Sequence, residues 1–132
     1  MATHRFAEHG GEVELEFEAP TEEGIFEAAV AAFAELVSNE RGGEPARHEF
    51  ELVADDRAGL LVEALNELVY LADVEQFVPE RLEAYEQTGG RLRLVVAGHR
   101  GGARPIVKAV TLNNLRFAHD GRTWHGRVVV DV

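Results

Sequence analysis

The chain has 132 residues and is expected to form a single domain over residues 1–132. Its 13 Lys and Arg against 24 Asp and Glu give a net charge of −11, which argues against direct nucleic-acid binding. The absence of cysteine excludes disulfides, thiolate zinc sites and cysteine nucleophiles. The sequence after Met1 has no apolar signal-peptide core, and the longest apolar run, Ala28 to Ala34, is too short to span a bilayer. We therefore expect a cytoplasmic protein without membrane contact.

The first predicted strand and helix follow each other closely. In Glu12 to Glu18, glutamates alternate with Val, Leu and Phe, which is the period of a half-buried strand. Thr21 is a suitable N-cap for the helix that follows, and a polar loop is expected over Ser38 to Pro45. The helix has apolar residues at spacings of three and four: Ile25, Ala29, Ala32, Phe33 and Leu36.

A second strand and a second helix come next. The strand is expected over His48 to Val53, and Asp55-Asp56 then opens a helix that should end near Asp73. This helix carries a broad apolar stripe formed by Leu60, Leu61, Ala64, Leu65, Leu68 and Leu71.

The rest of the chain is predicted to be strand. Gly89-Gly90 and Asp120-Gly121 are hairpin signals, and Gly98 to Pro105 reads as a connecting loop. The predicted strands are Arg81 to Glu86, Arg91 to Ala97, Ile106 to Phe117 and Thr123 to Val132.

Two early helices and consecutive late strands indicate an α+β fold. The last three strands are joined by short links and should be antiparallel. We predict a two-layer sandwich in which both helices pack on one face of a mainly antiparallel sheet. The two layers should share one core that includes Phe33, Leu65, Leu68, Leu94 and Val128.

Most motifs that carry chemistry are missing. The chain has no P-loop and no dinucleotide fingerprint. No two of its six histidines share a helix face at metal-ligand spacing: His4, His9, His48, His99, His119 and His125.

Two short segments are candidates for a site. His9-Gly10-Gly11-Glu12 places a His and a Glu around paired glycines, which allow a sharp turn or close approach to a ligand. In Val128 to Val132 an apolar strand ends on Asp131, beside a terminal carboxylate, and adjacent carboxylates repel unless a cation lies between them. Taken alone, both segments are also compatible with acidic strand ends in solvent.

Four segments resemble the archease family, in the family's order and over nearly the whole chain. Lys-Ala-Val-Thr at Lys108 to Thr111 and the terminal Val-Asp-Val are more specific than the two helices. The helices that resemble those of the family are Ile25 to Val37 and Leu60 to Asp73.

The resemblance implies an archease-like fold and an accessory protein rather than an enzyme. Archeases assist the RNA-splicing ligase that joins a 3′-phosphate or cyclic-phosphate end to a 5′-hydroxyl end. They promote guanylylation of the ligase and its multiple turnover, in tRNA splicing or RNA repair. The expected partner is therefore this ligase, with no direct contact to nucleic acid.

The resemblance also implies which residues act. Glu12, Lys108 and Asp131 stand at the family's ligase-activating positions, and Glu12, Asp131 and Val132 would hold a divalent cation such as Ca²⁺. The chain departs from the family twice: Glu12 replaces the Asp of His-Thr-Ala-Asp, and Leu112-Asn113 replaces Tyr-His.

Two other functions stay open at the level of sequence. One is a metal-dependent enzyme or small-ligand binder that uses the same acidic residues, although no residue pair has the spacing of a known acid–base or nucleophile motif. The other is an acidic protein-interaction module that needs no metal.

Overall fold

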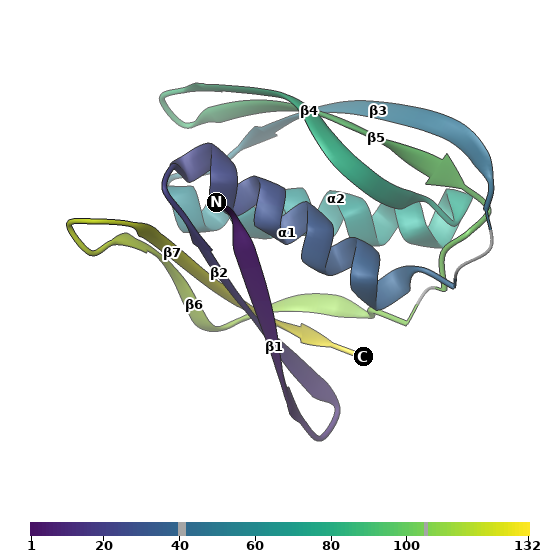
Figure 1. Cartoon of the computed structure of the whole chain (residues 1–132), viewed down its shortest axis with the longest axis horizontal. Helices are drawn as coiled ribbons and strands as arrows, with labels where there is room; N and C mark the ends of the chain where they lie inside the picture. Colours follow the sequence, from purple (N-terminus) through teal and green to yellow (C-terminus); the bar gives the residue numbers. More distant parts are fainter. Residues whose placement is uncertain (40–41, 105) are drawn as a thin grey trace.

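Two helices lie between two antiparallel sheets in the computed structural model, which describes residues 1–39, 42–104 and 106–132 (Figure 1). The elements in chain order are β1 (Thr3–His9), β2 (Glu12–Ala19), α1 (Glu22–Val37), β3 (Glu44–Val53), α2 (Arg57–Glu75), β4 (Val78–Thr88), β5 (Arg91–Arg100), β6 (Ala109–His119) and β7 (Trp124–Asp131). The first sheet has the strand order β1-β2-β7-β6, and the second has the order β3-β5-β4.

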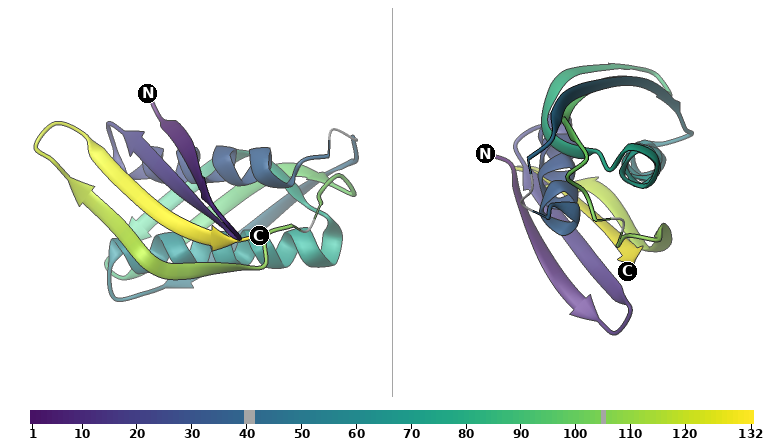
Figure 2. Two further views of the ribbon diagram at one scale, coloured as in Figure 1. Left: turned by 90° about the horizontal axis from the view of Figure 1, so that it is seen from below. Right: turned by 90° about the vertical axis from the view of Figure 1, so that its right-hand side faces the viewer.

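Both helices pack against both sheets. Helix α1 contacts β2 of the first sheet and β4 of the second, while α2 contacts β6 and β3. Figure 2 shows the second sheet curving over the helices, with the first sheet on their other side. The predicted α+β sandwich, with two helices packed on antiparallel strands, is confirmed, but the strands form two sheets on either side of the helices instead of the single sheet that the sequence predicted.

The segment after β5 explains this division. It leads from the second sheet to the first, so β5 and β6 are not neighbours although a loop joins them. The amide of Gly101 donates to the carbonyl of Gln76 (3.0 Å) at the end of α2, and the amide of Arg104 donates to the carbonyl of Val37 (2.6 Å) at the end of α1. Because these bonds satisfy terminal carbonyls of both helices, the segment crosses the helix ends instead of folding back into a hairpin.

The sequence pattern missed β1 and misplaced several element ends. β1 pairs with β2 through a turn in which Gly10 has a φ of 64°, a backbone conformation that glycine adopts without strain. β3 starts at Glu44 rather than His48, and it tolerates Pro45 because it is an edge strand. Helix α2 ends at Glu75 rather than near Asp73.

Parts of two predicted loops cannot be compared with the structure. Residues 40 and 41, in the predicted loop Ser38 to Pro45, lie outside the described residues. So does residue 105, at the end of the predicted loop Gly98 to Pro105.

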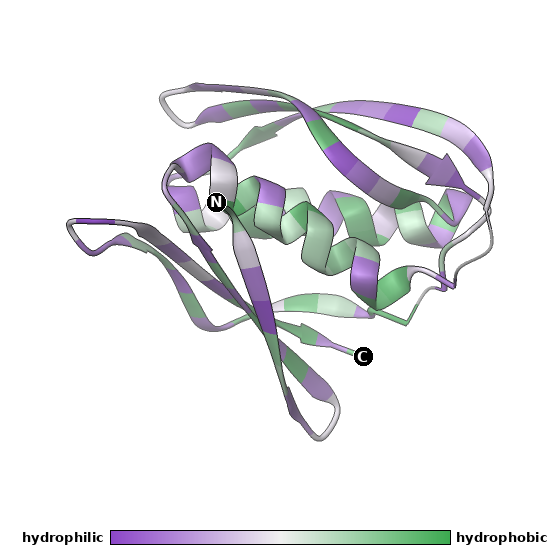
Figure 3. Ribbon diagram, viewed as in Figure 1, coloured by the Kyte–Doolittle hydropathy of each residue, from purple (hydrophilic) through white to green (hydrophobic). Residues whose placement is uncertain are grey.

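The core lies between the sheets and includes the apolar sides of both helices (Figure 3). Phe33 and Leu65 are 0% and 1% exposed, so the two helices bury their central residues fully. The prediction of a shared core is confirmed, because one cluster contains Phe33, Leu65, Leu68, Leu94 and Val128. Within the described chain, neither helix has the length and apolar character needed to cross a membrane.

Candidate functional site

The register of the first sheet brings the two candidate segments together. Glu12, the first residue of β2, lies directly opposite Asp131, the last residue of β7. The amide of Val132 donates to the carbonyl of Gly11 (3.0 Å), which holds the end of β7 beside the β1–β2 turn. On the other side of β7, the amide of Lys108 donates to the carbonyl of Asp131 (2.8 Å). Residues from three segments that are distant in sequence therefore meet at one end of the sheet, and we call Glu12, Lys108, Asp131 and Val132 the acidic end.

Strand alternation decides which way the acidic end faces. Val13 and Leu15 of β2 point into the core, so Glu12 and Glu14 point to the outer face, away from the helices. Asp131 pairs with Glu12 and shares this face, because cross-strand partners lie on the same side of a sheet. Both carboxylate residues are half-buried.

A polar cavity of about 310 Å³ lies beside the acidic end on this outer face. It is lined by His9, Glu12, Glu14, Asn113, Asn114 and Val129. Glu14 could have been found from the alternation of β2, which places it on the face of Glu12. The two asparagines could not, because they reach the cavity through an irregularity in β6.

That irregularity is a bulge between Thr111 and Arg116, where the pairing of β6 with β7 shifts register. Asn114 has a φ of 55°, a left-handed conformation that Asn tolerates better than most residues. Its carbonyl accepts a 2.8 Å hydrogen bond from Nε of Arg127 on β7. The bulge also leaves Leu112 72% exposed. Leu112 and Asn113 therefore belong to this bulge, and Asn113 lines the cavity.

The charges of the acidic end are not neutralised within the described part of the chain. Neither Glu12 nor Asp131 makes a side-chain hydrogen bond or ion pair with a described residue. The ammonium of Lys108, which is exposed, likewise has no carboxylate of a described residue within ion-pair distance. Two carboxylates at adjacent positions without a counter-charge repel each other, and a cation between them would relieve that repulsion.

The oxygen atoms of the acidic end are of the chemical type that a hard divalent cation prefers. Such cations prefer carboxylate and main-chain oxygens, which Glu12, Asp131 and Val132 supply. No group of three or more His, Asp or Glu side chains in the described residues is arranged to hold a metal. Two side chains and Val132 would therefore leave several coordination positions to water, as sites for Ca²⁺ and Mg²⁺ often do.

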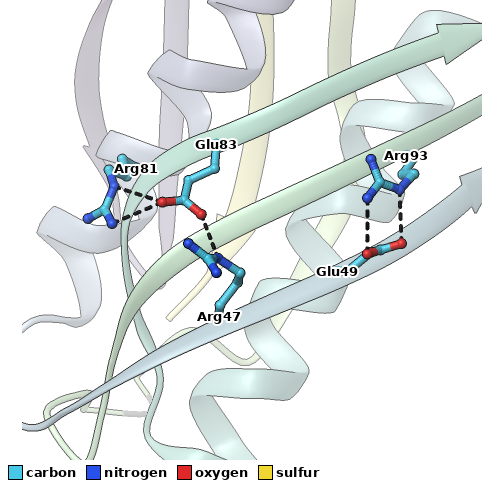
Figure 4. Close-up of polar contacts among 5 residues, drawn as sticks. All are labelled: Arg47, Glu49, Arg81, Glu83 and Arg93. Atoms are coloured by element: carbon cyan, nitrogen blue, oxygen red, sulfur yellow. Dashed lines mark hydrogen bonds and ion pairs between the residues drawn. The ribbon is translucent and has the colours of Figure 1, made fainter.

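On the outer face of the second sheet, by contrast, charged side chains form ion pairs with one another (Figure 4). Arg93 donates two hydrogen bonds to Glu49, and Glu83 accepts from both Arg47 and Arg81. The hydrogen bond from Arg93 lowers the pKa of the Glu49 carboxyl below its ordinary value. Each of these arginines therefore has a glutamate partner, unlike the charged residues of the acidic end.

Four histidines lie beside carboxylates rather than beside one another. The distances are 2.6 Å for His4–Glu35, 3.2 Å for His48–Glu75, 3.1 Å for His99–Glu80 and 2.8 Å for His125–Asp120. Each of these contacts uses a different carboxylate, so no histidine cluster forms among the four.

The structure therefore defines an α+β protein with two helices between antiparallel sheets and an acidic strand end open to the surface. Residues 4–132 match the family model described as the Archease protein family (MTH1598/TM1083). The chain belongs to the archease family.

Individual relatives agree with this assignment. The protein archease of Pyrobaculum neutrophilum is 32% identical over 99% of this chain and 96% of its own. The solution structure of Methanobacterium thermoautotrophicum protein 1598 shares the fold with a TM-score of 0.75 at 22% identity, covering 98% of both chains. The crystal structure of a Thermotoga maritima archease, described as a possible chaperone, gives a TM-score of 0.69 at 18% identity over 96% of this chain and 94% of that one.

Proposed function

We propose that this protein is an accessory factor of the 3′-phosphate RNA-splicing ligase, and that it promotes guanylylation and multiple turnover of the ligase rather than catalysing a reaction itself. The observation that supports this most is the register that places Glu12 opposite Asp131, with Lys108 bonded to the same strand end. These are the positions at which the chain resembles the ligase-activating residues of archeases.

The acidic end is suited to contact another protein. Its carboxylates and the Lys108 ammonium have no charged partner among the described residues, so a ligase surface could pair with them without first breaking internal ion pairs. The exposed Leu112, which precedes the cavity residue Asn113 in the chain, adds an apolar contact of the kind found at interfaces.

A divalent cation, with Ca²⁺ as the first candidate, belongs to the proposal. Glu12, Asp131 and Val132 would hold it, and it would supply positive charge between carboxylates that otherwise repel. Glu12 is one methylene longer than the aspartate of the family pattern, so we expect affinity or coordination geometry to differ from other archeases.

Multiple-turnover ligation by the ligase of the same species tests the proposal. Substoichiometric archease should raise the yield of joined RNA, and Asp131→Asn should remove most of that gain. Glu63→Gln is the matched control, because it removes one charge from the exposed surface of α2, outside the acidic end and outside the cavities of the first sheet. Equal loss of stimulation in both variants would favour a diffuse acidic surface and would contradict a role for the acidic end.

The cation is tested separately by calorimetric titration of the protein with Ca²⁺, Mn²⁺ and Mg²⁺. We expect binding by the unmodified protein and weaker binding by Asp131→Asn. Absence of binding at millimolar concentrations would remove the cation from the account and leave the ligase role to the protein surface alone.

A further inference from the structure

A row of charged residues crosses the outer face of the first sheet, away from the acidic end. The register pairs Arg5 of β1 with Glu16 of β2, Glu16 with Arg127 of β7, and Arg127 with Arg116 of β6. We call Arg5, Arg127 and Arg116 the arginine row. Three arginines therefore stand at one level of the sheet, with a single glutamate among them, in a protein of net charge −11.

Arg116 and Arg127 face each other without a counter-charge between them. Like charges at directly opposite positions of neighbouring strands are destabilising. On the other side of Arg127, Glu16 forms its ion pair with Arg5, although its charge also acts on Arg127 across the strands. Arg127 donates from Nε to the Asn114 carbonyl, and its terminal nitrogens make no hydrogen bond within the described chain.

Arg116 has even fewer hydrogen-bond partners than Arg127. Its guanidinium makes neither a hydrogen bond nor an ion pair with any described residue. On the second sheet, by contrast, Arg47, Arg81 and Arg93 all pair with glutamates (Figure 4). The chain thus pairs the arginines of the second sheet with glutamates and leaves two arginines of the first sheet facing each other.

The arginine row lines a cavity of about 530 Å³, together with Thr3, Glu16, Glu18 and His125. This volume lies in the range of small-molecule sites. His125 is bonded to Asp120 (2.8 Å), and Glu16 is bonded to Arg5. Glu18 is the remaining acid in the lining, so the cationic part of the cavity is its β6–β7 side.

We propose that this cavity binds a phosphate-type oxyanion between Arg116 and Arg127. Each guanidinium presents a planar fork of N–H donors that matches two oxygens of a phosphate. The two arginines share the single carboxylate of Glu16, which also pairs with Arg5, so a doubly charged phosphate supplies the missing negative charge and accepts hydrogen bonds from both guanidinium groups. The ligand is inorganic phosphate or the phosphate group of a nucleotide.

This site is independent of the acidic end. Glu12 and Glu16 are four positions apart on β2, which separates the two sites by roughly 13 Å along the strand. Binding of an oxyanion can therefore be measured on the isolated protein, whatever the outcome for the ligase.

Calorimetric titration with inorganic phosphate at constant ionic strength tests the proposal. The unmodified protein should bind one phosphate, and Arg116→Ala should bind about tenfold more weakly, as expected for loss of one charged hydrogen-bonding partner. The matched control is Arg122→Ala, which removes the same charge from the exposed β6–β7 turn outside the cavity and should bind as the unmodified protein does.

Arg127→Lys adds a second variant that keeps the charge and removes the fork. Weaker phosphate binding by this variant supports a guanidinium site, and unchanged binding contradicts it. A second titration compares inorganic triphosphate with a nucleoside triphosphate: equal affinity assigns the site to phosphate alone, and tighter nucleotide binding assigns it to a nucleotide. No binding of any of these ligands, or equal binding by Arg116→Ala and Arg122→Ala, would overturn the proposal.

Discussion

Asp120 closes the turn between β6 and β7 by bonding three donors. Its carboxylate accepts from the amides of Arg122 and Thr123 (both 2.9 Å) and from Nε2 of His125 (2.8 Å). These bonds, the Thr123 amide foremost, hold the pKa of the Asp120 carboxyl well below its ordinary value. The ionised form is therefore stabilised by folding, and the turn depends on the charge of this one side chain.

We predict that Asp120→Ala lowers the stability of the protein at neutral pH and that the loss shrinks in acid. A carboxylate whose pKa is depressed by folding contributes its full stability above the unfolded pKa, about 3.9. That contribution is lost as pH falls from about 4 through the lower folded pKa. Urea unfolding of both proteins at pH 7 and at pH 3 measures it, and a difference that grew on acidification would contradict this origin.

For the secondary-structure elements, the alternation of apolar and polar residues gave most of what the sequence could predict. Glutamates at every second position of β2 indicated both the strand and the outward direction of Glu12, as the structure shows. β1 was missed because its sequence, with Phe6 and Ala7 adjacent, has no clear period of two. The bulge at Asn113-Asn114 and the facing of Arg116 with Arg127 depend on register, which long-range pairing sets and a single sequence does not display.

The division of the strands between two sheets also depends on long-range contacts that a single sequence does not display. The links before and after β6 both looked like hairpin connections. Bonds to the helix ends, such as those from Gly101 and Arg104, distinguish the first link, which changes sheet, from the second, which does not.

The core between the elements gives a prediction for stability. Leu65 of α2 is 1% exposed and belongs to the main cluster, so Leu65→Ala should lower the free energy of unfolding by about 2–5 kcal/mol. Leu112→Ala is the matched control: the same atoms are removed from a side chain that is 72% exposed, and the change should stay within about 0.5 kcal/mol. Denaturant unfolding measures both, and a cost below about 1 kcal/mol for Leu65→Ala would remove it from the core.

For the whole molecule, the net charge of −11 is unevenly distributed. The outer face of the second sheet pairs its arginines with glutamates, and α2 carries no Lys or Arg after Arg57. The excess negative charge therefore lies on the helix surface and at the acidic end. Such a distribution repels phosphate backbones over the protein as a whole, even though the arginine row is locally cationic.

We predict that the isolated protein does not bind tRNA at physiological salt. RNA binding requires either Lys and Arg side chains that neutralise several phosphates or a stripe of aromatic and basic side chains that extends along several nucleotides. The described residues form neither of these. Fluorescence anisotropy with labelled tRNA is the measurement, and micromolar affinity would contradict the prediction.

Guanylylation of the ligase at limiting archease tests most directly the central claim, that the acidic end acts on the ligase. With the ligase of the same species, Lys108→Ala and Asp131→Ala should each abolish the stimulation while circular dichroism shows an intact fold. Arg122→Ala, which also removes an exposed cation, should stimulate as fully as the unmodified protein. Full stimulation by both Lys108→Ala and Asp131→Ala would show that the convergence of Glu12, Lys108 and Asp131 has no part in activation.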